Sequence, residues 1–454
     1  MVFSSLVFIY FFLPILFLVY FITPKRFKSI ILILFSLLFY FYGEGKFILI
    51  LLISSILNYF LSKKITNNKK ILIFGIIINL LPLIYFKYTN FILENVGAIF
   101  NTNLLIKNLI MPIGISFFTF QNISYLVDVY KDKKEKANNL IDYLLYITFF
   151  AQLVAGPIVR FSEIKEDINN RKLTFSNLYI GIKRFIIGLS KKVIISNNIG
   201  LLINILTNIS DKSILLYWIL AISYTLQIYF DFSGYSDMAI GLGKMFNFNF
   251  LENFNYPLIA KSITDFWRRW HISLSRWFKD YIYIPLGGNR GSKLKLIRNI
   301  FIVWSLTGLW HGASWNFILW GIYFGIILII EKMCLKNFLE KHKVLAHIYT
   351  LFLIIISFII FNITDIKNLG LFFKSMFGFN NLPFLNFETI YYLKSYLLIL
   401  IISIICATPI VKYISNSKIK KLIFLEPVIY MILLFISTSY LVDSTFNPFI
   451  YFRF

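Results

Sequence analysis

The sequence predicts an all-α protein that crosses a membrane about eleven times. Of its 454 residues, 58% are hydrophobic and 15% are charged, whereas soluble domains are about half apolar and a quarter charged. The first 22 residues are almost unbroken apolar sequence, long enough for a helix to cross a hydrocarbon core of about 30 Å. The net charge of +24 is dispersed in short clusters between apolar segments. Such clusters are typical of an orientation signal and not of a nucleic-acid-binding domain.

A cleaved signal peptide is the competing interpretation of residues 1–22. It fits poorly, because no basic residue precedes the apolar run and no small-residue cleavage site follows it. We therefore expect a retained first span. Since Lys25, Arg26 and Lys28 follow it, the N-terminus is expected outside and this loop in the cytoplasm.

Basic and weakly charged loops alternate through the first five predicted spans, at about 1–22, 29–42, 47–62, 71–86 and 109–129. Beyond them the charge pattern is ambiguous. Residues 141–157 and 213–230 each suit a span, yet the segment between them carries several Lys and Arg residues. Either one of the two is re-entrant, or residues 193–208 supply another crossing. Broken backbone at membrane depth is tolerated only where protein or a water-filled cavity surrounds it.

Residues 299–330 are predicted to form a hairpin, because the basic segments 261–298 and 331–343 on either side are both expected in the cytoplasm. Each arm has about 15 residues, or ~22 Å, which enters a bilayer deeply but barely crosses it. His311 and Gly312 lie near the tip. Further spans are expected at about 346–362, 395–411 and 423–442. We expect the whole chain, 1–454, to form a single membrane-embedded domain with re-entrant and interfacial helices.

His311 is an ionisable residue deep in this hairpin, within "SLTGLWHGASWNFILWG". Ionisable residues at such depth are costly, so a functional role is the first hypothesis. Burial disfavours the charged ring, and a neutral imidazole suits a general base that activates a hydroxyl. On these grounds alone, His311 is explained equally well as a histidine that packs between helices with its ring nitrogens hydrogen-bonded to neighbours.

Two further stretches carry charge in an apolar context. In "SITDFWRRWHISLSRWFKDYIYIPLGGNRG", tryptophans interleave with cations, as in an amphipathic segment at the cytoplasmic interface. Arg268 and Arg269 there either bind anionic lipid or form an anion site for a phosphorylated donor. In "YFDFSGYSDMAIGLG", Asp231 and Asp237 either line a polar tunnel and orient a histidine, or cap short helices.

Other catalytic templates are missing from the sequence. It contains no Walker A motif and no glycine-rich dinucleotide motif after a strand. Four histidines without ligand spacing argue against a metal site. The two cysteines, Cys334 and Cys406, form no metal or disulfide pattern.

Several long motifs resemble the membrane-bound O-acyltransferase family, in the bacterial branch that acetylates alginate and peptidoglycan. They are "MPIGISFFTFQNISYLVDVY", "QLVAGPIVRF", "YTLQIYFDFSGYSDMAIGLGKMF", "ENFNYP", "DFWRRWHISLSRWFKDYIYIPLGGNR" and "LTGLWHGASWNFILWG". The resemblance implies a ring of helices around a thinned centre crossed by a tunnel. It makes His311 the expected catalytic base and His271, in "RRWHIS", the second hallmark residue. The residues expected to line the donor site or tunnel are Asp231, Asp237, Arg268, Arg269 and Trp310.

The resemblance also implies an O-acetyltransferase of the bacterial plasma membrane. Acetyl-CoA would be its cytoplasmic donor substrate, with no bound cofactor, and a cell-surface polysaccharide the acceptor. The tail "FNPFIYFRF" resembles an aromatic C-terminal motif of this branch, which makes Tyr451 a candidate acyl carrier. Aromatic anchoring at the outer interface would explain it as well.

The expected partners are a separate extracellular SGNH-type acetyltransferase, membrane lipid and the polysaccharide, with no nucleic acid. The chain offers no extracellular segment large enough to bind a polymer. Two alternatives stay open. One is D-alanyl transfer to teichoic acid from a carrier protein, and the other is a transporter or flippase in which both histidines tolerate replacement by glutamine.

Overall fold

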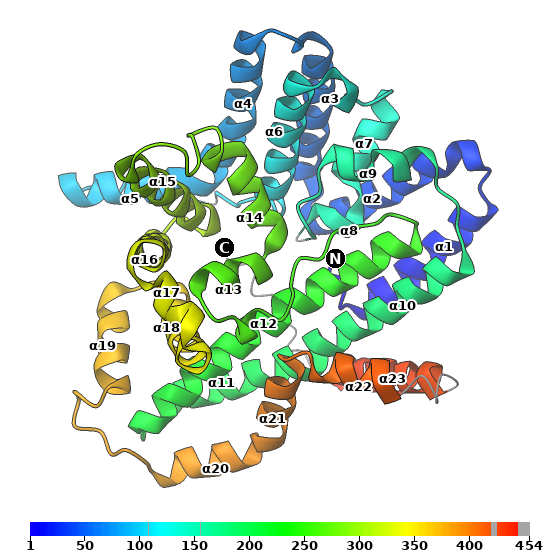
Figure 1. Ribbon diagram of the computed structural model, residues 1–454. Coiled ribbons are helices and arrows are strands. Elements are labelled where there is room, and N and C mark those ends of the chain that lie inside the picture. The colour runs from blue at the N-terminus through cyan, green and yellow to red at the C-terminus, as the bar shows by residue number, and fades with distance from the viewer. Residues whose placement is uncertain (108, 155, 419–424, 444–454) are drawn as a thin grey trace. The chain divides into compact units, whose positions relative to one another are not determined.

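Every regular element in the described residues is a helix, which confirms the all-α prediction (Figure 1). The computed structural model describes residues 1–454 except for Asn108, Ala155, 419–424 and 444–454. The chain divides into two compact units. Unit 1 comprises Met1–Phe185 with Tyr235–Glu252, and unit 2 comprises Ile186–Gly234 with Asn253–Phe454.

Seven helices in the described ranges are long and apolar enough to cross a membrane, or eight if one bent pair is counted as a span. They are Lys25–Lys64, Lys69–Phe100, Phe175–Asn208, Ile214–Met245, Trp315–Lys341, Lys343–Asn362 and Glu426–Asp443. The protein therefore has the helices of a multi-pass membrane protein, but the expected count of about eleven is not confirmed.

The count differs because several expected spans are short, broken or joined. Residues 1–22 contribute a shorter apolar helix, Phe8–Ile22. The expected span 141–157 is divided between α7 (Leu140–Thr148) and α8 (Phe150–Leu153). In the expected span 395–411, α21 (Leu397–Cys406) meets α20 (Phe387–Ser395) at a 57° bend. Hydropathy alone marks these segments as apolar but does not register such bends.

Unit 1 is a bundle around buried aromatic rings. Phe3, Phe8, Phe39 and Phe150 pack with ring centroids about 5 to 6 Å apart. Figure 1 shows α3, α4 and α6 side by side in this unit. Its helices, besides α7 and α8, are α1 (Leu13–Ile22), α2 (Lys28–Glu44), α3 (Ile48–Lys64), α4 (Lys69–Leu83), α5 (Thr89–Phe100), α6 (Ile115–Lys131) and α9 (Phe161–Asn169).

Two helices contribute residues to both units, α10 (Phe175–Ser190) and α12 (Ile214–Met245). In unit 2, a π-helical turn, Lys191–Asn197, leads from α10 into α11 (Asn198–Asn208). The other helices of unit 2, besides α20 and α21, are α13 (Ile263–Arg269), α14 (Ile272–Phe278), α15 (Lys293–His311), α16 (Trp315–Ile330), α17 (Lys336–Lys341), α18 (Lys343–Asn362), α19 (Ile366–Met376), α22 (Ile410–Lys418) and α23 (Glu426–Asp443).

The predicted hairpin is present as α15 and α16, which lie side by side in unit 2 (Figure 1). Two glycines allow the close approach. A Cβ atom on Gly308 would lie 2.3 Å from the Phe317 carbonyl oxygen, and one on Gly321 would lie 2.3 Å from the Trp304 carbonyl oxygen. Small residues at a helix interface bring the backbones together, so this pair fixes the hairpin's geometry.

Candidate active site

His311 is the last residue of α15, at the tip of the hairpin. It is 6% exposed. The next residue, Gly312, has extended backbone and no room for a side chain, because a Cβ atom there would lie 2.2 Å from the Phe317 ring. Helix α16 begins three residues later, at Trp315. The imidazole is therefore held where the backbone turns between the two helices.

Aromatic rings from three helices surround the His311 imidazole. The ring centroid of His311 lies 4.9 Å from that of Trp310 on α15, 4.8 Å from that of Trp320 on α16 and 5.3 Å from that of Phe361 on α18. All three contacts are edge-on, a favoured arrangement of aromatic rings. This enclosure keeps the imidazole in an apolar, low-dielectric setting.

His271 joins α13 to α14 in a left-handed backbone conformation, with φ +43°. Non-glycine residues adopt it at an energetic cost and only where neighbours fix the chain. Asn253 supplies that constraint, since its backbone oxygen accepts from the Ile272 N–H at 3.0 Å and its side-chain oxygen accepts from the Ser273 N–H at 3.1 Å. The loop before α13 thus positions the histidine.

The His271 ring is fully buried, and neither ring nitrogen has a hydrogen-bond partner in the described chain. Its neighbours are rings, with Phe232 at 4.6 Å and Trp310 at 5.8 Å between centroids. Burial lowers the pKa of His271 to about 3, because desolvation disfavours the charged form. His271 is therefore neutral at physiological pH.

Trp310 contacts both histidines, at 5.8 Å from the His271 ring and 4.9 Å from the His311 ring. It is 4% exposed. The two histidines, 40 positions apart in the sequence, are thus brought to one indole by α15 and the α13–α14 turn.

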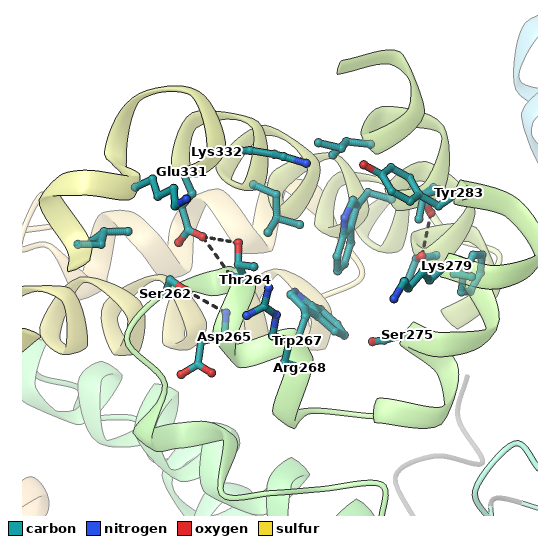
Figure 2. Close-up of a pocket in the computed structure, with 18 of the residues that line it drawn as sticks. Ser262, Thr264, Asp265, Trp267, Arg268, Ser275, Lys279, Tyr283, Glu331 and Lys332 are labelled. Atoms are coloured by element: carbon teal, nitrogen blue, oxygen red, sulfur yellow. Dashed lines mark hydrogen bonds between the residues drawn. The ribbon is translucent and has the colours of Figure 1, made fainter. Parts of the chain in front are cut away.

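A cavity of about 950 Å³ opens beside these elements in unit 2 (Figure 2). Six exposed cations line it, with three carboxylates, Asp265, Glu331 and Glu340. The cations are Lys261, Arg268, Lys279, Lys332, Lys336 and Lys343. This set of side chains favours an anionic ligand.

The inner wall of the cavity follows one face of α15. Ile300, Val303, Trp304 and Thr307 line it at spacings of three or four residues, which places them on the same side of the helix. His311 is the next position on that side, one turn or about 6 Å beyond Thr307. The face of α15 that lines the cavity therefore continues to His311, which does not itself line the cavity.

Comparison with known proteins settles the family. Residues 38–373, which include both histidines, match MBOAT, the membrane-bound O-acyltransferase family. The chain belongs to the MBOAT family. It is thus an acyltransferase and, with its candidate spans, a multi-pass protein of a bacterial membrane.

Relatives of this MBOAT protein include a probable alginate O-acetylase AlgI of Pseudomonas aeruginosa, 39% identical over 84% of this chain and 75% of that protein. A peptidoglycan O-acetyltransferase of Helicobacter pylori is 38% identical, over 84% of this chain and 80% of that protein. A teichoic acid D-alanyltransferase of Bacillus subtilis is 33% identical, over 52% of this chain and 61% of that protein.

The predicted site residues of this MBOAT protein lie in different places. Arg268 lines the cavity, whereas Arg269, on the next position of α13, pairs with Asp265 at 2.9 Å. Trp310 lies between the two histidines. Tyr451, the candidate acyl carrier, is outside the described residues.

The two predicted aspartates belong to different units. Asp231, in unit 2, forms a buried ion pair with Lys192 at 2.5 Å, and Lys192 also donates to Asn197 at 2.9 Å. Asp237, in unit 1, pairs with Arg184 at 2.6 Å. Neither aspartate lines the cavity beside α13 to α16.

Two features of this MBOAT site escaped the sequence analysis. Glu331, in a segment interpreted only as a basic loop, is 3% exposed and lines the cavity. Its carboxylate accepts from the Ile263 N–H at 2.6 Å. It also accepts from the Thr264 N–H at 3.0 Å (Figure 2). Trp267 and Trp320 lie in stretches that were singled out for other residues. Trp267 lines the cavity and Trp320 contacts His311, and the two rings, with centroids 5.7 Å apart, form the wall between the cavity and His311. The sequence did carry one signal for Glu331, because it is a lone glutamate directly after a long apolar run.

Proposed function

We propose that the protein transfers an acetyl group from acetyl-CoA in the cytoplasm across the plasma membrane, for O-acetylation of a cell-surface polysaccharide. The names of the relatives, an alginate O-acetylase and a peptidoglycan O-acetyltransferase at 38–39% identity, support this chemistry. The observation that carries the proposal is the single face of α15 that runs from the cationic cavity to His311.

The cavity suits the donor. Coenzyme A carries several phosphates, and lysine and arginine bind phosphate through charge-assisted hydrogen bonds. The basic segments 261–298 and 331–343, which supply the cavity's cations, are those expected on the cytoplasmic side. In this proposal the phosphates of the thioester bind these cations, and its pantetheine arm extends along the α15 face of Trp304 and Thr307 toward His311.

His311 acts as the general base in this proposal. Its neutral ring removes the proton of the acceptor hydroxyl while the hydroxyl oxygen attacks the thioester carbonyl carbon. The tetrahedral intermediate then expels the thiolate as the carbon–sulfur bond breaks, and the imidazolium returns the proton to that sulfur. The new ester and free coenzyme A balance the reaction, and His311 ends unchanged.

His271 and Tyr451 have supporting roles in the proposal. His271, neutral and enclosed by rings, is assigned to the donor side as a positioning group. Tyr451 is the proposed first acceptor, whose phenol oxygen holds the acetyl group before its final transfer. A separate extracellular SGNH-type acetyltransferase is proposed to complete the transfer to polysaccharide, with membrane lipid around both proteins.

A second candidate is D-alanyl transfer to teichoic acid from a carrier protein. It is favoured by the B. subtilis D-alanyltransferase, which matches about half of this chain. The two candidates differ in the acyl group and in the carrier of the thioester, so the donor distinguishes them.

The test uses purified protein in liposomes with radiolabelled acetyl-CoA. Wild type is compared with His311→Ala, Tyr451→Phe and, as a matched control, His342→Ala at an exposed position. The proposal expects thioester consumption by wild type and His342→Ala, its loss in His311→Ala, and label on the protein that is absent in Tyr451→Phe. Full activity of His311→Ala would refute the assignment of the base. Inactivity of wild type with acetyl-CoA but activity with a D-alanyl carrier protein would favour the second candidate.

A further inference from the structure

Two buried indole N–H groups lie in the wall between the cavity and His311. Trp267 is 7% exposed and Trp320 is 1% exposed, and the indole nitrogen of each is buried without a hydrogen-bond partner in the described chain. Most buried polar groups in proteins are paired, so an unpaired donor calls for an explanation. Such donors suit a ligand atom that arrives during function.

Trp320 is the one closer to the candidate base. Its ring lies 4.8 Å from the His311 ring, at an angle of 79°. Trp267 lines the cavity beside Arg268 (Figure 2) and reaches Trp320 at 5.7 Å. Of these two tryptophans, Trp320 is therefore the one whose ring contacts the proposed base, and its N–H is a buried donor.

We propose that Trp320 is a catalytic residue whose indole N–H donates a hydrogen bond to the thioester carbonyl oxygen as that oxygen becomes an oxyanion. The inference rests on the proposed function, because it places the reacting carbonyl beside His311. Attack of the hydroxyl oxygen on the carbonyl carbon moves the C=O π electrons onto oxygen, and this negative charge is what the N–H stabilises. When the carbon–sulfur bond breaks, the electrons return to re-form the carbonyl.

The surroundings of Trp320 strengthen such a hydrogen bond. The ring packs against Phe324 at 5.0 Å, Phe361 at 5.2 Å and Trp267 at 5.7 Å. In an apolar, water-excluded site, a preorganised donor stabilises a developing charge more strongly than it would in water. The same rings hold the indole in place, so no reorganisation is needed when the charge develops.

The test replaces the N–H and leaves the ring. Benzothienylalanine, in which sulfur takes the place of the indole N–H, is introduced at Trp320 by site-specific incorporation. The matched control is the same replacement at Trp218, whose N–H donates to the Met376 carbonyl at 3.0 Å, away from the cavity. Both variants lose one indole donor, but only the first loses the proposed catalytic one.

Activity is measured in proteoliposomes with acetyl-CoA, and donor binding with an analogue in which a methylene group replaces the thioester sulfur. The expected result is a fall in kcat on the order of 100-fold at Trp320, with analogue affinity unchanged and the Trp218 variant like wild type. A fall of less than tenfold, or a matching loss of analogue affinity, would overturn the inference.

His311→Ala in the same assay separates the two proposals: if it is inactive while the Trp320 variant is fully active, only the oxyanion assignment fails. Full activity of His311→Ala, or no thioester consumption by wild type, would overturn both.

Discussion

The buried carboxylate of Glu331 is hydrogen-bonded to Thr264 twice, accepting from its backbone N–H and from its hydroxyl at 3.0 Å each. Glu331 follows α16, which carries Trp320, whereas Thr264 belongs to the first turn of α13, which leads to His271. This contact therefore ties the helix beside one histidine to the helix that precedes the other.

Glu331→Ala is expected to loosen that connection. The change leaves buried N–H groups of α13 unpaired, which costs about 2 kcal/mol of stability. It also removes the contact that holds Thr264 and Trp267 in place in the cavity lining. We expect a lower thermal unfolding temperature in detergent and a higher KM for acetyl-CoA. Glu340→Ala removes an exposed carboxylate from the same cavity and serves as the stability control. Equal unfolding temperatures for the two variants would contradict the anchoring role.

Acid is expected to destabilise the protein through His271. Its pKa is about 3 in the folded state and about 6.5 in an unfolded chain. Between these two pKa values the unfolded state binds the proton and the folded state does not. The contribution of His271 to the free energy of unfolding is therefore fully present above pH 6.5 and is lost as the pH falls toward 3.

His271→Gln removes this titration. Between pH 7 and pH 4, the unfolding temperature of the variant should therefore fall less steeply than that of wild type. The exposed His342→Gln should keep the wild-type slope. Parallel slopes for wild type and His271→Gln would show that the buried ring does not contribute as described.

The exposed cations of the cavity are expected to bind the donor's phosphates. Reversing the charge of Lys332 and Lys336 together should raise KM for acetyl-CoA by about tenfold at low salt and less at high salt, because surface charges are screened. Lys374→Glu, an exposed change on α19 away from the cavity, should leave KM unchanged. A KM in the double variant that matches the control at every ionic strength would place the phosphates elsewhere.

The Lys192–Asp231 ion pair is expected to be needed for the stability of the folded protein. Both side chains are almost fully buried, so removing one leaves an uncompensated charge at a cost of about 3–5 kcal/mol. Lys192→Met or Asp231→Leu alone should therefore reduce the yield of folded protein. The double variant, which removes both charges, should recover most of it. If the double variant folds but cannot transfer acetyl groups, the pair has a role in the reaction beyond packing.

The sequence predicted the hairpin that carries His311 more accurately than the number of spans. Two basic segments enclosing residues 299–330 were enough to predict a hairpin with His311 near its tip, because charge decides which ends of a helix stay in the cytoplasm. The expected number of spans is not confirmed, because bends such as that between α20 and α21 arise from packing, which hydropathy does not report.

The contact between Glu331 and Thr264 could not be predicted from the sequence, for a different reason. Glu331 and Thr264 are 67 positions apart, and nothing in either segment indicates the other. Likewise, no sequence feature distinguishes Trp320, whose indole N–H has no partner in the described chain, from Trp218, whose N–H donates to the Met376 carbonyl.

If His311 is the base, as proposed, its aromatic enclosure limits the size of the acyl group that can react there. Phe317 fills the space next to Gly312, and Phe361 packs against Phe317 at 4.9 Å. A two-carbon acyl group requires little room beside the imidazole, whereas a longer chain would have to displace these rings. We therefore expect kcat/KM to fall by about five- to 150-fold from acetyl-CoA to butyryl-CoA, since displacing well-packed rings costs about 1–3 kcal/mol. Phe317→Ala should narrow that gap, and equal rates for both thioesters in wild type would contradict it. Selection for short acyl groups would then be set at the hairpin tip, independently of how tightly the cavity holds coenzyme A.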